Sequence, residues 1–463
     1  MKKNILYRVY TALFIGMCLA PAALMPAVKG SDSKEKRELA EMPKVKTEDG
    51  KLNFEFFDQF STYFSEHFAF RQELVTADGR LKSAVLGTST NPDVIVGKDG
   101  WLYYGPTADD FLGINTLSER GINNITGNLR MIDEYCTQQG SSFVFTIAPN
   151  KNSIYPEHMP FNYVKSGDKN NYERIAEDLS GAGFWCDMKE TLLNADASIP
   201  LYHKTDTHWN NLGAYAGHVG LMGALGKEPC SPGTKWSTRD DRLGDLAAMI
   251  YPSEDAKDTQ VYSDYQFTYN YMGRFKALDD LDIRTSCQNG QGSLLMYRDS
   301  YGEAILPYMA EVYENAQFSR LVPYRLDQLG GRDLIIEIVE RNIGDLQQYA
   351  PLMPAPETEA PAANAVYVGS EAELRQESSG AYVHFYGVLP DQCFDSDSAE
   401  IYLTADGRSY KAFNAFEARL LDREGEVSDN GFSLYVPTEN IPEGCTVTLT
   451  VASSTGRAIQ VNF

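Results

Sequence analysis

Short, continuous apolar runs separated by helix-like segments constrain the fold of this chain more than any other feature. Residues 142–148, 294–297 and 333–339 are such runs, and runs of this kind are typical of strands buried on both faces of a parallel sheet. Helix-like patterns at residues 117–139 and 301–312 flank them. Buried strands that alternate with helices predict an α/β domain with a mostly parallel sheet.

Composition divides the rest of the chain around this domain. Residues 31–50 are highly charged and predict a stalk, whereas the α/β pattern extends over residues 51–350. Residues 351–365 are rich in Pro and Ala and predict a linker. Short strand-like runs between turns fill residues 366–463 and predict a small C-terminal β-sandwich as an accessory domain.

Residues 1–30 predict a targeting segment. A basic start precedes an apolar stretch over residues 9–24, and Ala20-Pro21-Ala22 offers a small-residue cleavage site. The apolar stretch is barely long enough to span a bilayer. The segment is therefore either a cleaved signal peptide or an anchor on the outer face of the cytoplasmic membrane, and both predict an extracytoplasmic protein.

Charge and cysteine content narrow the partners and the chemistry. The net charge is −23, with 64 acidic and 41 basic residues, which argues against nucleic acid or an anionic membrane surface as the main partner. Six cysteines follow Cys18, and an oxidising compartment permits disulfides. Cys393 and Cys445 are the only pair in the C-terminal region and are expected to bond. No two cysteines have C-x-x-C spacing, so the sequence does not suggest a zinc site.

An aromatic-rich segment spans residues 54–70. The spacing of its Phe and Tyr side chains fits a helix that packs one face on a core. We therefore expect this segment to be part of the structural core.

Two separated motifs carry the chemistry. Asp206 stands two residues before His208, so its carboxylate can reach Nδ1 of the imidazole and leave Nε2 free. Ser300 follows an apolar run and precedes a helix-like segment whose N-terminal N–H groups can stabilise an oxyanion. Together the three residues predict acyl transfer through a serine ester.

Other interpretations of these residues remain open. Asp299 and Ser300 can cap a helix. His203, Asp206 and His208 can share a metal ion, although no further ligand cluster is evident, and we predict no metal site. These alternatives are to be decided by geometry.

Five segments of the chain carry a family resemblance. In order they are residues 94–103 (VIVGKDGWLY), 148–157 (APNKNSIYPE), 205–209 (TDTHW), 298–301 (RDSY) and 340–342 (ERN). Over residues 50–345 the chain resembles the SGNH-hydrolase-like acetyltransferases of the AlgX and AlgJ type and the DHHW proteins of Gram-positive bacteria. Arg298 stands where the family usually has Gly, and Thr207 stands where the DHHW branch has His.

The resemblance implies an exported polysaccharide O-acetyltransferase with Ser300 as nucleophile, His208 as base and Asp206 as its orienting acid. It implies a polysaccharide acceptor and a membrane-bound O-acyltransferase as acetyl donor. We expect no cofactor. Four further residues are candidates for oxyanion or substrate binding, and each can equally be structural: Asn150, Tyr301, Arg325 and Trp209. Two other functions remain open, namely an acetylesterase with the same triad and a non-catalytic glycan-binding scaffold.

Overall fold

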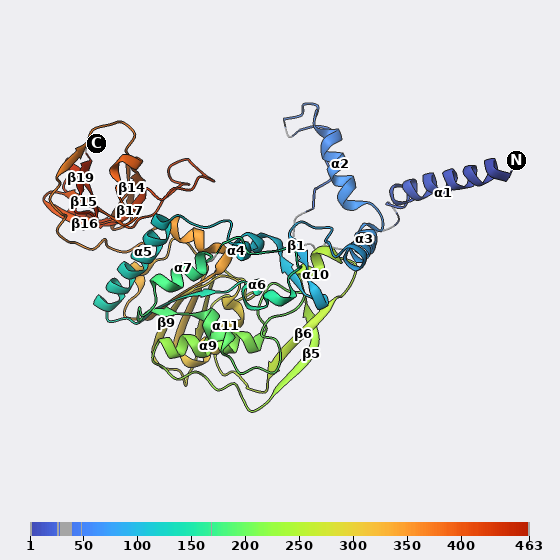
Figure 1. Cartoon of the computed structure of the whole chain (residues 1–463), viewed down its shortest axis with the longest axis horizontal. Helices are drawn as coiled ribbons and strands as arrows, with labels where there is room; N and C mark the ends of the chain where they lie inside the picture. The colour runs from blue at the N-terminus through green and yellow to red at the C-terminus, as the bar shows by residue number, and fades with distance from the viewer. Residues whose placement is uncertain (1, 26, 28–38, 48, 168, 462–463) are drawn as a thin grey trace.

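The structure is a computed structural model that describes residues 2–25, 27, 39–47, 49–167 and 169–461. Part of the expected stalk and the end of the targeting segment lie outside these residues. The described part contains an α/β domain with a mixed central sheet, a C-terminal region rich in strands, and N-terminal helices that project from the α/β domain (Figure 1).

The central sheet has seven strands in the order β4-β3-β11-β9-β10-β8-β7. Neighbours from β4 to β10 pair in parallel, whereas β8 and β7 pair antiparallel at one edge. The three apolar runs of the sequence form β3, β9 and β11. The bounds are β3 (Phe143–Ala148), β4 (Trp185–Cys186), β7 (Asn270–Met272), β8 (Asp282–Ser286), β9 (Ser293–Tyr297), β10 (Asn315–Ser319) and β11 (Asp333–Val339).

Helices cover both faces of this sheet and explain why its strands are apolar throughout. Side chains of α8 (Met188–Leu193), α9 (Asn211–Ala224) and α11 (Gly302–Val312) share one buried cluster with the sheet. Those of α5 (Glu119–Gln138) and α7 (Asn171–Asp178) share the cluster on the opposite face. All six residues of β3 are buried as a result. This arrangement leaves the carboxyl ends of the parallel strands as the edge available for a site.

Smaller elements complete the α/β domain. Residues 94–104 form a two-stranded sheet, and a second antiparallel pair, which was not predicted from the sequence, encloses a short helix. Their bounds are β1 (Val94–Val96), β2 (Leu102–Tyr104), β5 (Trp236–Leu243), β6 (Lys257–Ser263), α4 (Ala108–Leu112), α6 (Lys151–Ile154) and α10 (Asp245–Ile250).

The C-terminal region contains two sheets, in the orders β12-β19-β18-β15-β16 and β13-β14-β17. Side chains from both sheets meet in one hydrophobic cluster. The strands are β12 (Ala365–Tyr367), β13 (Glu373–Ser379), β14 (Tyr382–Val388), β15 (Ala399–Ala405), β16 (Arg408–Lys411), β17 (Gly431–Pro437), β18 (Val447–Ser453) and β19 (Ala458–Val461).

The C-terminal region packs against α5 of the α/β domain. Asn128 and Asn414 exchange two hydrogen bonds of 3.0 Å, and Asn124 donates to the Asp429 carbonyl at 2.9 Å. The Pro- and Ala-rich segment between the two parts is anchored at its start, since Met353 and Ala355 are buried. The two parts are therefore joined by specific contacts as well as by the chain.

Two expectations from the sequence are wrong. The aromatic segment forms α2 (Phe56–His67), but none of the residues of α2 is buried, because the helix projects away from the α/β core (Figure 1). Cys393 and Cys445 do not bond, since all six described cysteines are free. Two cysteines in the same region of a chain do not bond unless the fold brings their sulfur atoms within bonding distance.

Candidate active site

Asp206 and His208 lie in a narrow loop that leads directly into α9. Tyr202 and Trp209 form a bridge across the base of this loop, and the Asn210 N–H donates to the Leu201 carbonyl at 2.8 Å. The Asn210 side chain caps α9 by accepting from the second and third N–H groups of the helix. The cap fixes where the loop ends, and so fixes the position of His208 two residues earlier.

Lys151 holds the same loop from inside the protein. Its Nζ is buried and donates to the carbonyls of His203, Lys204 and Asp206 at 3.0, 3.0 and 2.7 Å. Burial lowers the pKa of Lys151 to about 8, although nearby carboxylates, including Asp206, partly oppose this shift. The Lys of the "PNK" segment therefore has a structural role that its sequence motif did not reveal.

The strand pair β5–β6 packs against the outer side of this loop. Asp258 of β6 accepts from the Thr205 N–H and hydroxyl at 2.6 and 2.9 Å. Gly244 lies so close that a Cβ there would come within 2.4 Å of the Thr205 carbonyl oxygen. Glycine is thus required for this close contact, which brings Arg242 and Asp245 to the site.

Ser300 lies in the turn between β9 and α11, at the carboxyl end of the sheet. The Asp299 carboxylate accepts from the Tyr301 N–H at 2.8 Å and from the Val339 N–H at 2.7 Å, so it ties the turn to the end of β11. Gly302 has no room for a Cβ, which would lie 2.6 Å from Cβ of Arg298. These contacts hold the half-buried Ser300 in one position.

The three expected residues of the triad meet. Nδ1 of His208 lies 2.8 Å from Oδ1 of Asp206, and Nε2 lies 2.9 Å from Oγ of Ser300. The Asp206 side chain is fully buried, whereas the His208 side chain is 18% exposed. A buried carboxylate behind a partly accessible imidazole is the arrangement that orients a base toward a nucleophile.

Arg242 completes the surroundings of Asp206, and the sequence analysis did not identify it. Its Nε and Nη2 lie 3.0 and 2.9 Å from Oδ2, the carboxylate oxygen that His208 does not use. Burial alone would raise the pKa of Asp206, but the hydrogen bond and charge of His208 and the charge of Arg242 hold that pKa well below its usual range. These contacts favour the ionised form of Asp206.

A β-bulge aims Arg242 at this carboxylate. The pairing of β5 with β6 is regular up to Asp240, which faces Thr259, and then shifts so that Arg242 faces Asp258. An extra residue in one strand turns the following side chain toward a new direction. No sequence motif marks a bulge of this kind, and this explains why Arg242 was missed.

Asp245 is a second carboxylate beside the imidazole, at 3.8 Å from Nδ1 of His208. Asp206, His208 and Asp245 are grouped closely enough to share a metal ion. However, the Asp245 oxygens accept from the N–H and hydroxyl of Thr207 at 2.7 and 2.8 Å, and Arg242 occupies Asp206. Because donors already contact these carboxylates, and one donor is a cation, the geometry favours the serine interpretation over a metal site.

Trp209 and Tyr301 lie behind the triad. The Trp209 indole N–H donates to the Tyr301 carbonyl at 3.0 Å, and the Tyr301 hydroxyl donates to the Thr207 carbonyl at 2.8 Å. Both side chains are buried, and the Tyr301 ring lies 4.9 Å from the His208 ring. Through these contacts Trp209 and Tyr301 pack against the His208 ring and hold it in place.

Among the residues that the structure describes, Asn150 and Arg325 form no hydrogen bond or ion pair with Asp206, His208 or Ser300. The Asn150 side chain is fully buried and donates to Oδ2 of Asp110 at 3.0 Å. Arg325 is half exposed and pairs with Asp327 at 2.9 Å. An oxyanion role for Asn150 and a substrate-binding role for Arg325 therefore stay predictions.

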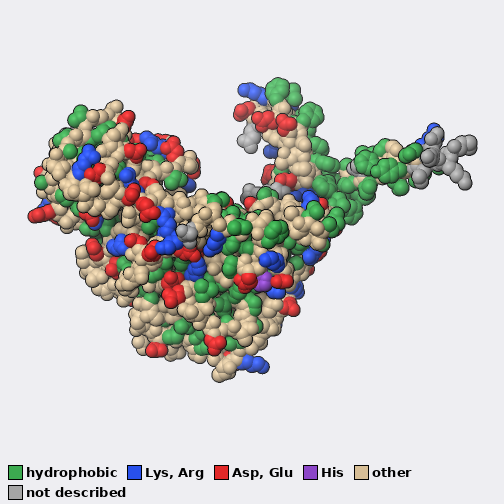
Figure 2. Space-filling view, in the orientation of Figure 1, with side chains coloured by type: hydrophobic (Ala, Val, Ile, Leu, Met, Phe, Trp, Pro, Cys, Tyr) green, Lys and Arg blue, Asp and Glu red, His purple; other side chains and the backbone are tan. Residues whose placement is uncertain are grey.

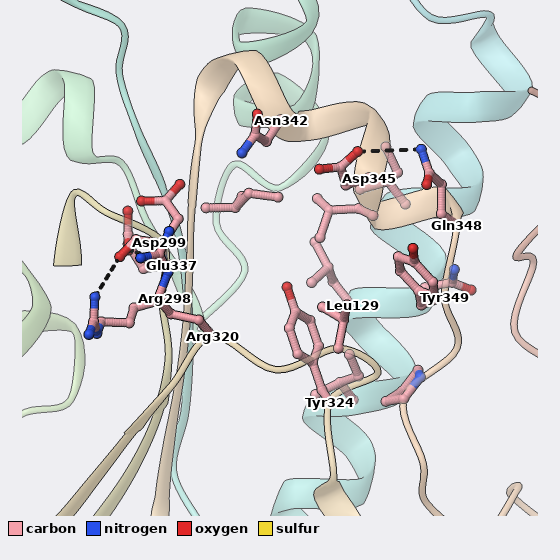
Figure 3. A pocket seen from close by; sticks show the side chains of 17 residues that line it. Leu129, Arg298, Asp299, Arg320, Tyr324, Glu337, Asn342, Asp345, Gln348 and Tyr349 are labelled. Carbon is pink, nitrogen blue, oxygen red and sulfur yellow. Dashed lines mark hydrogen bonds between the residues drawn. The ribbon is translucent and has the colours of Figure 1, made fainter. Parts of the chain in front are cut away.

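A cavity of about 310 Å³ is lined by Arg298 and Asp299, the two residues that precede Ser300 (Figure 3). Arg298, Asp299 and Glu337 form one side of it, opposite Leu129 of α5 and Tyr324. Burial, together with the charge of Asp299, raises the pKa of Glu337 well above its usual range. Asp206, His208 and Ser300 do not line this cavity.

Known proteins are similar in sequence to part of the α/β domain. Residues 94–275 match the family model described as the SGNH hydrolase-like domain of the acetyltransferase AlgX. A protein of Pseudomonas syringae pv. tomato named probable alginate O-acetylase AlgJ is 30% identical over 141 residues, which is 30% of this chain and 34% of the relative. The match thus spans about a third of that relative's length.

Two solved structures are also similar. A DHHW family protein from Eubacterium siraeum covers 54% of this chain and 95% of its own, with 19% identity and a TM-score of 0.40. The O-acetyltransferase domain of Pseudomonas putida AlgJ covers 55% of this chain and 92% of its own, with 17% identity and a TM-score of 0.36. The resemblance expected from the sequence is confirmed.

Proposed function

We propose that this protein is an extracytoplasmic O-acetyltransferase that moves an acetyl group to a polysaccharide through an acetyl ester on Ser300. The observation that carries the proposal is the His208 ring between its two partners, 2.8 Å from Asp206 and 2.9 Å from Ser300. The match of residues 94–275 to the AlgX domain supports acetyl transfer as the reaction.

The first half of the reaction forms the ester. Oγ of Ser300 attacks the acetyl carbonyl of the donor while Nε2 of His208 takes the hydroxyl proton. The donor's leaving group departs with that proton. Asp206, held ionised by Arg242, stabilises the positive imidazole between these two events.

The second half transfers the acetyl group. A glycan hydroxyl gives its proton to His208 and attacks the ester, and Ser300 then recovers the proton as the O-acetylated glycan leaves. Water as the acceptor would instead release acetate. The triad is the same in both cases, so the acceptor distinguishes the transferase from the acetylesterase.

The partners follow from the location of the protein. The N-terminal helix α1 (Lys2–Leu24) is long and apolar enough to cross a membrane over Tyr7–Leu24 and is compatible with a signal peptide or an anchor. Because acetyl-CoA is not available outside the cell, a membrane-bound O-acyltransferase is the proposed acetyl donor. The proposed acceptor is a polysaccharide, in keeping with the relative named alginate O-acetylase.

We further propose that the two C-terminal sheets form a β-sandwich that serves as an accessory domain, for glycan binding or for docking of a protein. The shared hydrophobic cluster of the two sheets supports a sandwich. The hydrogen bonds to α5 support a fixed orientation relative to the α/β domain.

The decisive experiment is intact mass spectrometry of the protein after incubation with p-nitrophenyl acetate. We expect one added acetyl group on the peptide that contains Ser300, and none in the Ser300→Ala variant. The absence of an adduct together with no release of p-nitrophenol would contradict a serine ester and favour a binding scaffold. Free acetate without acetylated glycan, in the presence of a polysaccharide acceptor, would identify an esterase.

A further inference from the structure

The helices at the N-terminus carry an exposed apolar surface that the proposed reaction does not use. We define this N-terminal apolar surface as the exposed large hydrophobic side chains between residues 54 and 86. They are Phe54 (93% exposed), Phe57 (80%), Phe60 (37%), Phe70 (44%), Leu74 (51%), Leu81 (63%), Val85 (69%) and Leu86 (66%). Isolated exposed hydrophobic residues are ordinary, but a contiguous group of them marks an interaction surface.

The aromatic side chains of α2 contact one another rather than a core. Phe56 lies 6.0 Å from Phe60, Phe60 lies 6.5 Å from Phe64, and Phe64 lies 6.2 Å from Phe68, between ring centroids. These residues follow each other at four-residue steps and form one stripe along the helix. No residue of α2 is buried, and Phe60 is exposed, whereas Phe56, Phe64 and Phe68 are partly exposed. The stripe is therefore open to a partner along part of its surface.

The adjoining helix α3 (Arg71–Leu86) fixes this surface to the body of the protein. Its inner face packs closely, because a Cβ on Gly79 would lie 2.5 Å from the Ile250 carbonyl oxygen. The Tyr251 hydroxyl also donates to Ser83 at 2.8 Å. The outer face therefore presents Leu74, Leu81 and Val85 to the solvent without being free to turn inward.

The surface is continuous with the apolar helix α1. The Ala69 N–H, between α2 and α3, donates to the Pro21 carbonyl near the end of α1 at 3.3 Å. Figure 2 shows hydrophobic side chains that continue from α1 onto the foot of α2 and onto α3. Because α1 is apolar enough to cross a membrane, we expect the N-terminal apolar surface to contact the same membrane.

We propose that the N-terminal apolar surface lies in the interface of a lipid bilayer, with Phe57 and Phe60 of α2 against the acyl chains. An amphipathic helix with aromatic residues on one face binds a bilayer in this way. Residues 54–70 carry Glu55, Asp58 and Glu66 but no Lys or Arg. Insertion is therefore driven by apolar area, and anionic lipids are not required.

This surface keeps the α/β domain against the membrane at a second contact besides α1. It also keeps its effect if α1 is removed as a signal peptide, because α2 and α3 follow the cleavage site suggested by Ala20-Pro21-Ala22. The inference is independent of the serine ester, since membrane contact does not depend on Ser300.

The test uses the full chain reconstituted in phosphatidylcholine vesicles with brominated acyl chains, which quench tryptophan in contact with them. Phe57→Trp adds one fluorophore to the four native tryptophans, and the native chain supplies the background. We expect the added fluorescence to be blue-shifted and to lose about half of its intensity or more in brominated vesicles. Added phosphatidylglycerol should not increase this loss.

A matched control is Val427→Trp, at a position 77% exposed in the C-terminal region, which lies at the opposite end of the molecule from α1 (Figure 1). Its added fluorescence should remain unquenched. The proposal is overturned if Trp at position 57 is unquenched while the chain floats with the vesicles. A blue shift without quenching overturns it as well, because the occupant is then a protein, either a second copy or a membrane partner.

Discussion

Arg242 and Asp206 form a two-point contact in which Nε and Nη2 of the guanidinium both approach Oδ2, at 3.0 and 2.9 Å. Oδ1 of the same carboxylate accepts from His208 at 2.8 Å. Arg242 and His208 thus use different oxygens of one buried carboxylate. Arg242 counterbalances a negative charge that the fold would otherwise bury unpaired beside His208.

This contact predicts a change in the pH–rate profile. Arg242→Gln removes a positive charge that helps to hold the pKa of Asp206 low, so the carboxylate that orients His208 becomes easier to protonate. The acidic limb of kcat/KM should therefore move to higher pH by about 0.5–1 pH unit, after allowing for the partial exposure of the guanidinium. The measurement is hydrolysis of p-nitrophenyl acetate between pH 4 and pH 9, as an approximate range.

Arg239→Gln is the matched control for this prediction. Arg239 lies on the same strand, is 59% exposed and pairs with Asp241 at 3.7 Å, so its removal should leave the limb unchanged. An unchanged limb in Arg242→Gln itself would mean that Arg242 only stabilises the fold.

Asp206→Asn should separate orientation from folding. The amide keeps the shape of the side chain but no longer holds the imidazole in the required tautomer, and a loss of roughly 10⁴ in kcat is expected with the acetyl ester. Circular dichroism should report a folded protein. A loss smaller than about tenfold would contradict the orienting role of Asp206.

Tyr301→Phe tests whether Tyr301 supports the site or binds the acceptor. The change removes the donor to the buried Thr207 carbonyl, 2.8 Å away, and should lower the free energy of unfolding by about 1–3 kcal/mol. We expect kcat to fall, because the loop of His208 loosens, while KM for the glycan stays unchanged. A raised KM with an unchanged kcat would instead assign Tyr301 to sugar binding.

Glu417→Gln tests a titration at the junction of the two parts of the chain. Glu417 accepts from the Ala350 N–H at 3.2 Å and from Ser433 at 2.9 Å, and burial raises its pKa from 4.5 to about 7. Between pH 4.5 and about pH 7, Glu417 is protonated in the folded state but ionised in the unfolded state. Its contribution to the free energy of unfolding is therefore complete below pH 4.5 and is lost as the pH rises through about 7.

The wild type should therefore lose up to about 3 kcal/mol of stability from this group across that window. The glutamine variant keeps the accepting oxygen but cannot titrate, so its stability should fall less over the same pH range. The measurement is urea denaturation of both proteins at pH 5 and pH 8, as approximate values. Identical pH dependence in the two proteins would contradict the raised pKa of Glu417.

Local sequence was sufficient to predict those strands and contacts that depend only on residues close together in the chain. The runs that became β3, β9 and β11 are apolar because both faces of the sheet are covered, and apolarity can be read from the chain. Asp206 and His208 are two residues apart, so their contact was predictable from spacing. Ser300 was found through its motif, although its distance to His208 follows only from the fold.

The tertiary structure decided what sequence patterns do not encode. The bulge before Arg242 is a property of strand pairing, and the three carbonyls around Lys151 converge only when the loop closes. The aromatic pattern of α2 correctly predicted a helix with one apolar face, but not what covers that face. Periodicity determines which side of a helix is apolar, whereas contacts between distant segments determine whether that side meets a core.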